Sequence, residues 1–330
     1  MKSDAIDIVY LWCDGAEPEF RRQKEELERN GRYCYKEDNM GDVRYVENEE
    51  LRYSLRSICM NAPWFNHIYI VTNKQIPKWI KLTSKLSIVD HEEIIPESVL
   101  PTFNSNVIET YIHKIPGLSE KFIYFNDDMF VNRPITPDFF FNGDRPVLRM
   151  KRGDDLFFPT VEEGDRLLTG DKIDDFRKTL LRSWLVVVKK NKKVPWVIRS
   201  HCPDPYTKSI CNYCEKKYPE IQEINVTPFR IGKDVQWQLV VNLEMISGMG
   251  MPYKLREKQI NFWVRHFNKF LLRTVDEYEG TECDKTRNRI KNLNPMMFCL
   301  NSDVHMNKEN RRKSRLFLED LFKKPSVFEL

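Results

Sequence analysis

The stretch FIYFNDDMF, residues 122–130, joins an apolar run to an asparagine and two adjacent aspartates, and then becomes apolar again. The aromatic and β-branched residues before Asn126 predict a buried strand. Desolvation and mutual repulsion oppose two like charges at the end of such a strand unless a cation lies beside them. Asp127 and Asp128 therefore predict a site for Mg²⁺ or Mn²⁺, which bind carboxylate oxygens; the alternative is a solvated turn.

The sequence before this stretch alternates between strand-like and helix-like patterns. Three more short apolar runs predict strands, at residues 6–12, 67–72 and 86–90. One helix is expected after Asn48, its predicted cap, and ends before Pro63; another is expected at 106–114. This alternation is typical of an α/β fold with a mostly parallel sheet and flanking helices.

Polar side chains follow the predicted strands. They are Asp14, Thr72, Asn73, Asp90, Asp127 and Asp128. In an open parallel sheet, ligands bind beyond the carboxyl ends of the strands. One aspartate at a strand end is common, but several at equivalent ends indicate one shared site.

The second half of the chain has a looser pattern. Residues 150–171 look like a loop or irregular insertion, whereas 182–190, with the apolar run WLVVV, and 194–200 resemble an antiparallel strand pair. Helices are expected at 207–218, 233–247 and 257–271. The tail 307–330 has a basic start and an amphipathic segment. Because no repeat or low-complexity linker separates the halves, we expect one structural unit with a more helical C-terminal half.

The composition excludes several classes of protein. The chain has 330 residues, 41% hydrophobic and 31% charged, which is typical of a soluble globular protein with a large core. A net charge of +4 gives no reason to expect nucleic-acid binding. No stretch approaches the roughly 20 apolar residues of a spanning helix. The N-terminus is too short and too acidic for a secretory signal, so we expect cytoplasmic residence.

Eight cysteines at irregular spacing fit reduced and mostly buried thiols. Cys211 and Cys214 form a lone C-x-x-C, which lacks the second pair that a zinc site would need. Both fall on the same helical face as Ile210 and Tyr218, so we expect them to pack in the core.

Three further side chains are candidates for chemistry. Glu109 lies near the start of its predicted helix, where it either reaches the same strand ends or only favours the helix dipole. His201, in a loop braced by two prolines, suits a general base. Arg230 precedes a helix and suits a phosphate clamp. A plain surface position is the alternative for His201 and Arg230.

Longer motifs carry a family resemblance. They are IDIVYLWCDG (6–15), ENEELRYSLRSICMNAPWFNHIYIVTNKQIPKWI (47–80) and LPTFNSNVIETYIHKIPGLSEKFIYFNDDMFVNRPI (100–135). Together they resemble the Stealth family of sugar-1-phosphate transferases. This family contains the bacterial capsular polysaccharide phosphotransferases and is related to the catalytic core of the lysosomal-enzyme N-acetylglucosamine-1-phosphotransferase. The resemblance is nearly continuous from 43 to 141. It continues in patches through HCPDPYTKS (201–209), FRIGKDVQ (229–236), FCLNSD (298–303) and LFKKPSVFE (321–329).

The resemblance implies a glycosyltransferase-A-like α/β fold, a divalent metal, Mg²⁺ or Mn²⁺, and a UDP-sugar donor such as UDP-N-acetylhexosamine. It also implies transfer of hexose- or N-acetylhexosamine-1-phosphate to a hydroxyl of a growing glycan in capsular or surface polysaccharide synthesis, with release of UMP. The family's essential acidic residues match Glu109 and Asp128, and its essential histidine and arginine match His201 and Arg230.

The resemblance also suggests a role for each of these residues. Asp127 and Asp128 would hold the metal. Arg230 would neutralise a phosphate oxygen, and His201 would take the proton of the acceptor hydroxyl. Glu109 would either hold a water on the metal or orient the base.

Donor binding would fall mainly to residues 1–141, the nucleotide-sugar and metal-binding core. Residues 142–330 would complete the catalytic unit with acceptor-side and phosphate-binding elements. The turn at Asp14–Gly15 would hold the uracil or ribose. Diphosphate contacts are expected from Arg44, Arg52 and Arg56, unless the last two only lie on the exposed side of their helix. Three asparagines complete the donor-binding set: Asn48, Asn104 and Asn126.

The chain departs from the family pattern at a few positions. Cys13 stands where the first motif usually has valine, which we interpret as a packing change. Asn106 stands where family members often carry a histidine, and this bears on the choice of donor or acceptor. The inserted serine in CLNSD leaves the roles of Asn301 and Asp303 open.

Two other functions fit the same residues. A metal-dependent glycosyltransferase would attack the sugar carbon and release UDP, because one fold hosts both chemistries. A catalytically inactive carbohydrate-binding assembly protein would keep the fold without turnover. The basic, amphipathic tail either packs on the core or rests on the inner membrane face beside the capsule assembly machinery.

Overall fold

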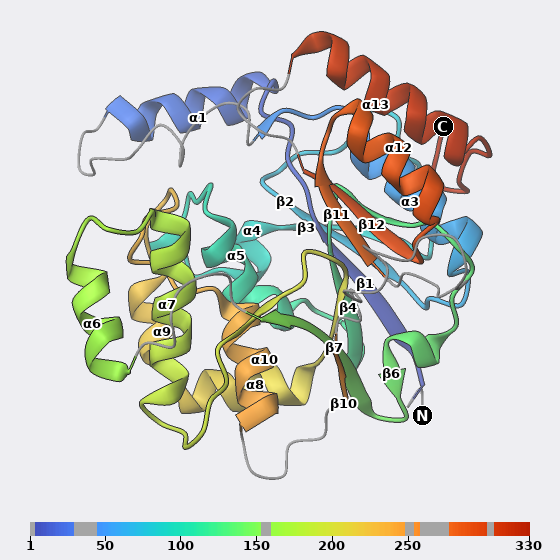
Figure 1. The fold of residues 1–330 in the computed structure, drawn as a ribbon. Helices are drawn as coiled ribbons and strands as arrows, with labels where there is room; N and C mark the ends of the chain where they lie inside the picture. Colours follow the sequence, from blue (N-terminus) through green and yellow to red (C-terminus); the bar gives the residue numbers. More distant parts are fainter. Residues whose placement is uncertain (1–3, 30–44, 153–159, 248–253, 258–276, 302–306) are drawn as a thin grey trace.

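The computed structural model describes residues 4–29, 45–152, 160–247, 254–257, 277–301 and 307–330. Its central sheet has the strand order β3-β2-β1-β4-β9 (Figure 1). The strands are β1 (Ile6–Leu11), β2 (Ile68–Thr72), β3 (Leu86–Asp90), β4 (Lys121–Asn126) and β9 (Asp204–Thr207). The β1–β2, β2–β3 and β1–β4 pairs are parallel, and β9 joins β4 in antiparallel orientation. The predicted α/β fold with a mostly parallel sheet is therefore confirmed.

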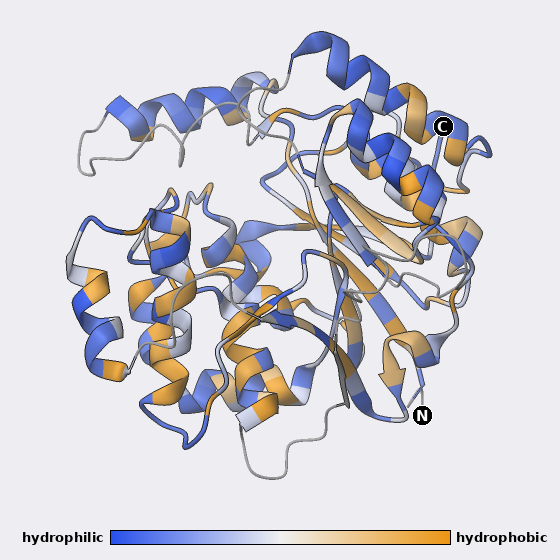
Figure 2. Ribbon diagram, in the orientation of Figure 1, coloured by the Kyte–Doolittle hydropathy of each residue, from blue (hydrophilic) through white to orange (hydrophobic). Residues whose placement is uncertain are grey.

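Helices cover both faces of this sheet, which explains why β1 is apolar almost throughout. Ile8 and Tyr10 face a hydrophobic cluster that includes Leu51 and Leu55 of α3, whereas Val9 faces a second cluster built largely by helices of the second half. Figure 2 shows hydrophobic residues both along the central strands and on helices that cover them, such as α7 and α10. The helices are α3 (Glu50–Asn61) on one face and α5 (Ser105–Tyr111), α7 (Asp175–Val188), α8 (Lys208–Lys217) and α10 (Trp237–Ser247) on the other.

Two smaller sheets adjoin the central one. One contains β6 (Phe141–Asn142), β7 (Arg145–Arg152), β8 (Val197–Arg199) and β10 (Lys254–Glu257). The other contains β5 (Met129–Val131), β11 (Glu277–Thr281) and β12 (Met297–Asn301). Because β5 follows β4 after only Asp127 and Asp128, this last sheet brings β11 and β12 to the carboxyl end of β4.

The remaining helices lie around these sheets. They are α1 (Pro18–Arg29), α4 (His91–Ile94), α6 (Val161–Thr169), α9 (Glu220–Ile224), α12 (Asp284–Leu293) and α13 (Lys308–Leu321), with single 3-10 turns at Glu97–Val99, Ile112–Lys114 and Pro137–Phe139. Phe317 and Phe322 pack on Phe130 of β5 and Phe298 of β12, so the tail does pack on the core. Among the residues that the structure describes, no helix is long and apolar enough to cross a membrane.

The apolar run WLVVV is not a strand, as the sequence suggested, but the end of α7. The Asp174 side chain caps this helix by accepting a hydrogen bond from the Arg177 backbone at 2.8 Å. Leu181, Trp184 and Leu185 are buried at helical spacing. Their packing overrides the strand preference of the valines. Residues 197–199 do form a strand, but it pairs with β7.

Other local predictions also change. Residues 150–171 contain the end of β7 and α6, whose Thr160 and Glu163 form a capping box. Asn48 does not cap α3: Glu49 occupies that position with φ 66°, and no side chain caps the helix. Residues 258–271 of the predicted helix at 257–271 lie outside the described residues. Strand β9 adds the second half of the chain to the first half's sheet, in keeping with one structural unit.

Cys211 and Cys214 both lie in α8 and are 2% and 0% exposed. They belong to the hydrophobic cluster on that face of the sheet. The packing interpretation of this C-x-x-C is therefore confirmed.

Candidate active site

Asp127 and Asp128 form the turn between β4 and β5, and each strand fixes one end of it. The Leu300 backbone of β12 donates a hydrogen bond to the Asp128 carbonyl at 3.1 Å. Oδ1 of Asp128 is buried and has no hydrogen-bond partner among the described residues. Burial, the neighbouring Asp128 and Glu47 raise the pKa of Asp127 to about 8. Burial also raises the pKa of Asp128, although His201 opposes the shift.

More carboxylates lie within electrostatic reach of this turn. Burial, Asp127 and Glu282 raise the pKa of Glu50 well above its usual value. Burial and Asp14 raise the pKa of Glu47 to about 7, against a smaller opposing effect of Arg315. A divalent cation would reverse these shifts, because it favours the charged carboxylates. The buried Oδ1 of Asp128 and the surplus of hard oxygen donors fit Mg²⁺ or Mn²⁺.

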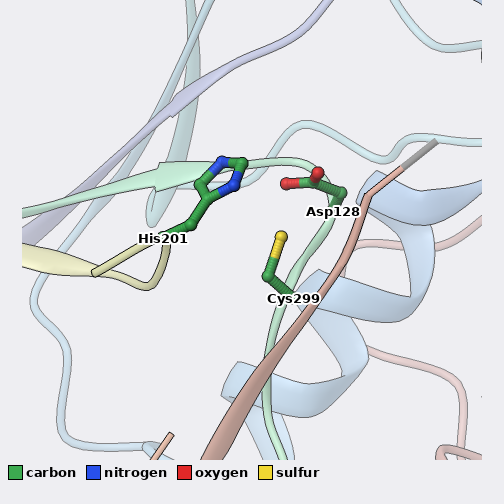
Figure 3. A group of neighbouring side chains, drawn as sticks. All are labelled: Asp128, His201 and Cys299. Atoms are coloured by element: carbon green, nitrogen blue, oxygen red, sulfur yellow. The ribbon is translucent and has the colours of Figure 1, made fainter. Parts of the chain in front are cut away.

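Asp128, His201 and Cys299 also have ligand atoms within 4.8 Å of one another (Figure 3). Such a set would suit a softer ion such as zinc if the thiol were ionised. Burial and Asp128 raise the pKa of Cys299 well above its usual value, so the thiol is neutral until a bound ion lowers that pKa. Its contact with Asp128 is accordingly that of a weak donor to a carboxylate. Because carboxylates outnumber this single thiol around the turn, the donor set favours an oxygen-binding ion on the aspartates.

A chain of hydrogen bonds links the predicted catalytic residues. The Tyr124 hydroxyl lies 3.0 Å from Oε1 of Glu109 and 2.6 Å from Oδ1 of Asn126. Nδ2 of Asn126 lies 3.1 Å from Nε2 of His201, and Nδ1 of His201 lies 3.2 Å from Oε1 of Glu279. The structure thus brings Glu109, Asn126 and His201 together at the end of β4, beside Asp128.

Arg230 lies on the Glu109 side of this chain. Its guanidinium donates a hydrogen bond to Oγ of Ser105 in the first turn of α5. Burial raises the pKa of Glu109, while the positive charges of Arg199 and Arg230 oppose the shift. Arg199 is itself paired with Asp204 at 2.5 Å. Of the two arginines near Glu109, Arg230 is therefore the one without an acidic partner among the described residues.

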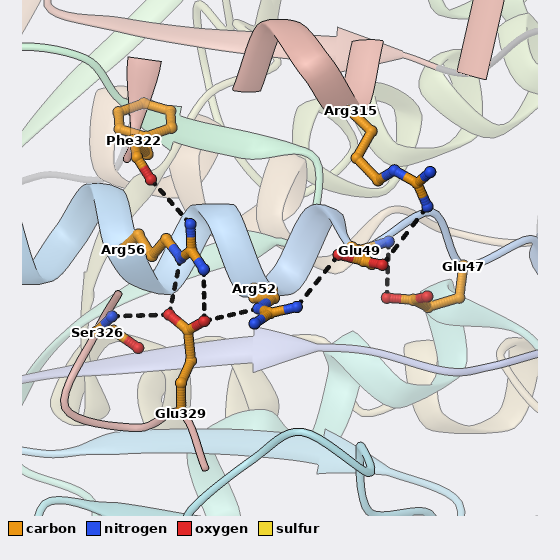
Figure 4. A network of polar contacts seen from close by, with 8 residues as sticks. All are labelled: Glu47, Glu49, Arg52, Arg56, Arg315, Phe322, Ser326 and Glu329. Atoms are coloured by element: carbon orange, nitrogen blue, oxygen red, sulfur yellow. Dashed lines mark hydrogen bonds and ion pairs between the residues drawn. The ribbon is translucent and has the colours of Figure 1, made fainter. Parts of the chain in front are cut away.

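Several predicted donor-binding residues have other partners. Asn104 is buried, caps α5, and donates to Asp234 at 2.8 Å, which fixes the loop that carries Arg230. Asn48 donates to the Arg311 carbonyl at 3.3 Å. Arg52 donates to Glu329 at 2.6 Å (Figure 4). The predicted roles of Asn48 and Arg52 in donor binding therefore gain no geometric support.

Gly15 has a close-packing role. A Cβ added there would lie 2.5 Å from Cβ of Tyr45 and 2.6 Å from its carbonyl oxygen, so only glycine fits. Asp14 stays at the same edge of the sheet, where its Oδ1 accepts from the Ala16 backbone at 2.9 Å. Arg44 and Asp303 lie outside the described residues.

Sequence reasoning missed Glu279, Tyr124 and the acidic residues Glu47, Glu50 and Glu282. Two signals could have identified part of this set. Glu277 and Glu279 alternate in a short strand, so both face one side of it. The run ENEE at 47–50 places acidic residues immediately before a helix whose start meets the turn at Asp127.

Comparisons with known proteins identify relatives of this chain. Residues 44–147 match the model of Stealth protein CR2, conserved region 2. The chain is 35% identical over 233 residues to an exopolysaccharide phosphotransferase of Streptomyces coelicolor, covering 70% of this chain and 38% of the relative. It is 32% identical over 333 residues to capsular polysaccharide phosphotransferase SacB of Neisseria meningitidis serogroup A, covering 98% of this chain and 57% of the relative.

Among solved structures, galactosyltransferase LgtC, in complex with donor and acceptor sugar analogs, matches 97% of this chain and 96% of its own, with 9% identity and a TM-score of 0.46. The chain spans between about two fifths and three fifths of the length of the two curated relatives named above. This chain therefore carries conserved region 2 of the Stealth proteins and is a homologue of the capsular and exopolysaccharide phosphotransferases.

Proposed function

We propose that this protein transfers hexose- or N-acetylhexosamine-1-phosphate from a UDP-sugar to a hydroxyl of a growing glycan and releases UMP. The observation that carries the proposal is the surplus of carboxylates around Asp127 and Asp128, next to a histidine held at both ring nitrogens. The names of the relatives, which are phosphotransferases of capsular polysaccharide and exopolysaccharide, favour phosphoryl transfer over sugar transfer.

In this reaction the acceptor oxygen forms a bond to the phosphorus that carries the sugar. The bond from that phosphorus to the oxygen bridging it to UMP breaks, and UMP leaves with the bonding electron pair. The proton of the acceptor hydroxyl passes to His201, whose Nε2 faces the end of β4. Positioning and charge stabilisation supply most of the catalysis in phosphoryl transfer.

Asp127 and Asp128 are the residues that would hold Mg²⁺ or Mn²⁺, which supplies positive charge to the diphosphate of the donor. Arg230 would contribute a second positive charge with its planar fork. Glu109, buried between Tyr124 and the two arginines, would keep this guanidinium and the hydrogen-bonded chain in place. Of the two roles considered for Glu109, this one corresponds to orienting the base rather than to holding a water on the metal.

The test is a nucleotide-release assay with the purified chain, Mg²⁺, a panel of UDP-sugars and candidate glycan acceptors. We expect UMP only when an acceptor is present, and its loss in Asp128→Asn. Asp171→Asn, a matched change at a fully exposed aspartate, is the control and should retain activity. Release of UDP would instead identify a glycosyltransferase. Donor binding without any turnover would indicate a carbohydrate-binding assembly protein.

Cytoplasmic residence and peripheral association with capsule assembly machinery at the membrane stay predictions. The second is tested by cell fractionation with exposed basic residues of α13, such as Arg312 and Lys313, changed to glutamine. Deleting the tail is a poor test, because α13 contributes buried aromatic side chains to the core. Unchanged membrane fractionation of the glutamine variant would count against association through this surface.

A further inference from the structure

His201 depends on other elements for the orientation of its ring. It lies in the connection between β8 and β9, and its side chain is 33% exposed. Each ring nitrogen is held from a different direction, Nδ1 by Glu279 of β11 and Nε2 by Asn126 of β4. These two contacts, from two different strands, fix the orientation of the imidazole ring although His201 itself lies in a loop.

The partners of Asn126 indicate which nitrogen of His201 carries the proton. Oδ1 of Asn126 accepts the short 2.6 Å hydrogen bond of the Tyr124 hydroxyl, so the amide group of Asn126 points toward His201. The NH₂ group of an amide can only donate, so this contact favours Nε2 as the acceptor. The remaining proton of the neutral ring then lies on Nδ1, where it is donated to Glu279.

Glu279 is itself fixed by two neighbouring strands. Nδ2 of Asn301 donates to its Oε1 at 3.0 Å, and Nζ of Lys151 lies 3.5 Å from its Oε2. Its backbone is in parallel register with Cys299 of β12. The position of the Glu279 carboxylate is therefore set by β-strands and does not depend on the loop that carries His201.

We propose that Glu279 is a positioning residue: it holds the proton of His201 on Nδ1 and leaves Nε2 unprotonated at the end of β4. Resting on the proposed function, Nε2 is then the atom that takes the proton of the acceptor hydroxyl, which would donate from the place that the Asn126 amide now occupies. Glu279 acts only through the histidine, as second partners of catalytic or metal-binding histidines commonly do.

The test is ¹⁵N NMR of the histidine rings in the full chain, because ring nitrogen shifts distinguish the two neutral tautomers. The chain has six histidines, and the His201 signals are assigned by their loss in His201→Gln. Glu279 and Asp128 raise the pKa of His201 despite burial, so spectra are taken at about pH 9, well above the ordinary histidine value near 6.5. We expect a protonated Nδ1 and an unprotonated Nε2 in the wild type.

Variants of Glu279 distinguish a role in positioning the proton of His201 from a role in stabilising the fold. Glu279→Leu should raise the fraction of His201 that carries its proton on Nε2, because only the Asn126 amide then opposes that tautomer, whereas Glu279→Gln, which keeps an acceptor oxygen, should restore the wild-type tautomer. Thr281→Leu, at an exposed position of the same strand, is the control and should leave the tautomer unchanged. In the UMP assay, Glu279→Leu should lower kcat about 10- to 100-fold with little change in the KM of the donor, and Glu279→Gln should recover part of it.

The tautomer of His201 tests the inference about Glu279, whereas nucleotide release tests the proposed function. A protonated Nε2 of His201 in the wild type would overturn the inference. So would an unchanged tautomer in Glu279→Leu. The expected tautomers without any UMP release would leave the positioning role standing and refute the proposed function.

Discussion

Two clusters of charge lie near helix α3 and differ in how their charges are balanced. At the C-terminal clamp, defined by Arg52, Arg56 and Glu329, one carboxylate receives both guanidinium groups at 2.6–2.8 Å (Figure 4). At the turn between β4 and β5, Asp127 and Asp128 are adjacent, partly buried and within electrostatic reach of further acidic residues.

The pKa shifts of the two clusters run in opposite directions. Burial alone would raise the pKa of Glu329, but hydrogen bonds from Arg56, the Ser326 backbone and Arg52 lower it to about 2. Burial and like charges raise the pKa of Asp127 to about 8. The clamp is electrostatically complete within the chain and holds the fold together. The turn carries more negative charge than its neighbours balance, as the proposed cation site requires.

The largest effect is expected from Asp128→Asn. UMP formation should fall about 10²- to 10³-fold, the scale of removing one preorganised electrostatic group. The melting temperature should stay equal or rise, because the substitution removes a buried charge and its repulsion from Asp127. Paired activity assays and thermal unfolding check both statements. Activity within twofold of wild type would remove Asp128 from the site.

The mirror change in the clamp is Glu329→Gln. It leaves two arginines without their carboxylate, and Arg56 is only 8% exposed. We expect a loss of about 2 kcal/mol in the free energy of unfolding, or roughly 30-fold in the folding equilibrium. Urea unfolding measures the loss, and kcat of the folded fraction should stay close to wild type. A large fall in kcat without a loss of stability would contradict the claim that the clamp stabilises the fold whereas the turn serves catalysis.

The clamp also predicts how stability depends on pH. The pKa of Glu329 is lower in the folded state than the ordinary value of 4.5, so its contribution is fully present above that value. The contribution is lost as the pH falls toward about 2. The difference in unfolding free energy between wild type and Glu329→Gln should therefore shrink between pH 4.5 and 2. A difference that is constant over this range would contradict the role given to Glu329.

The smallest effect is expected from Arg52→Gln. Its side chain is 31% exposed, and Arg56 still holds Glu329 when Arg52 is removed. Stability should fall by less than about 1 kcal/mol. The KM of the UDP-sugar should be unchanged, in contrast to the sequence prediction that Arg52 contacts the donor. A several-fold increase in this KM would restore that prediction.

The sequence predicted the parallel strands well, because a strand buried on both faces must be apolar almost throughout. IDIVYL is interrupted only by Asp7, and KFIYFN has polar residues only at its two ends. It predicted the wrong structure for WLVVV, where the Asp174 cap and upstream leucines outweighed the preference of three valines for strands. Local sequence signals were therefore sufficient where burial was uniform and insufficient where a helix cap decided the structure.

The sites depended on contacts between distant segments. Asp127, Asp128, Glu109 and His201 were identified from motifs, but Glu279 reaches His201 only because β12 pairs with both β5 and β11. Likewise Arg56 and Glu329 are 273 residues apart in the chain, and no pattern within α3 indicates that partner. Contacts of this kind follow from the packing of sheets and helices rather than from any single stretch.

The most direct measurement is thermal unfolding with increasing Mg²⁺ or Mn²⁺ in wild type, Glu329→Gln and Asp128→Asn. A cation that binds only the folded protein adds about 2.7 kcal/mol at 100 times its Kd. We expect the same increase in melting temperature for wild type and Glu329→Gln, and none for Asp128→Asn. A wild type unaffected by either ion, or an equal increase in Asp128→Asn, would contradict the claim that the turn between β4 and β5 is a cation site.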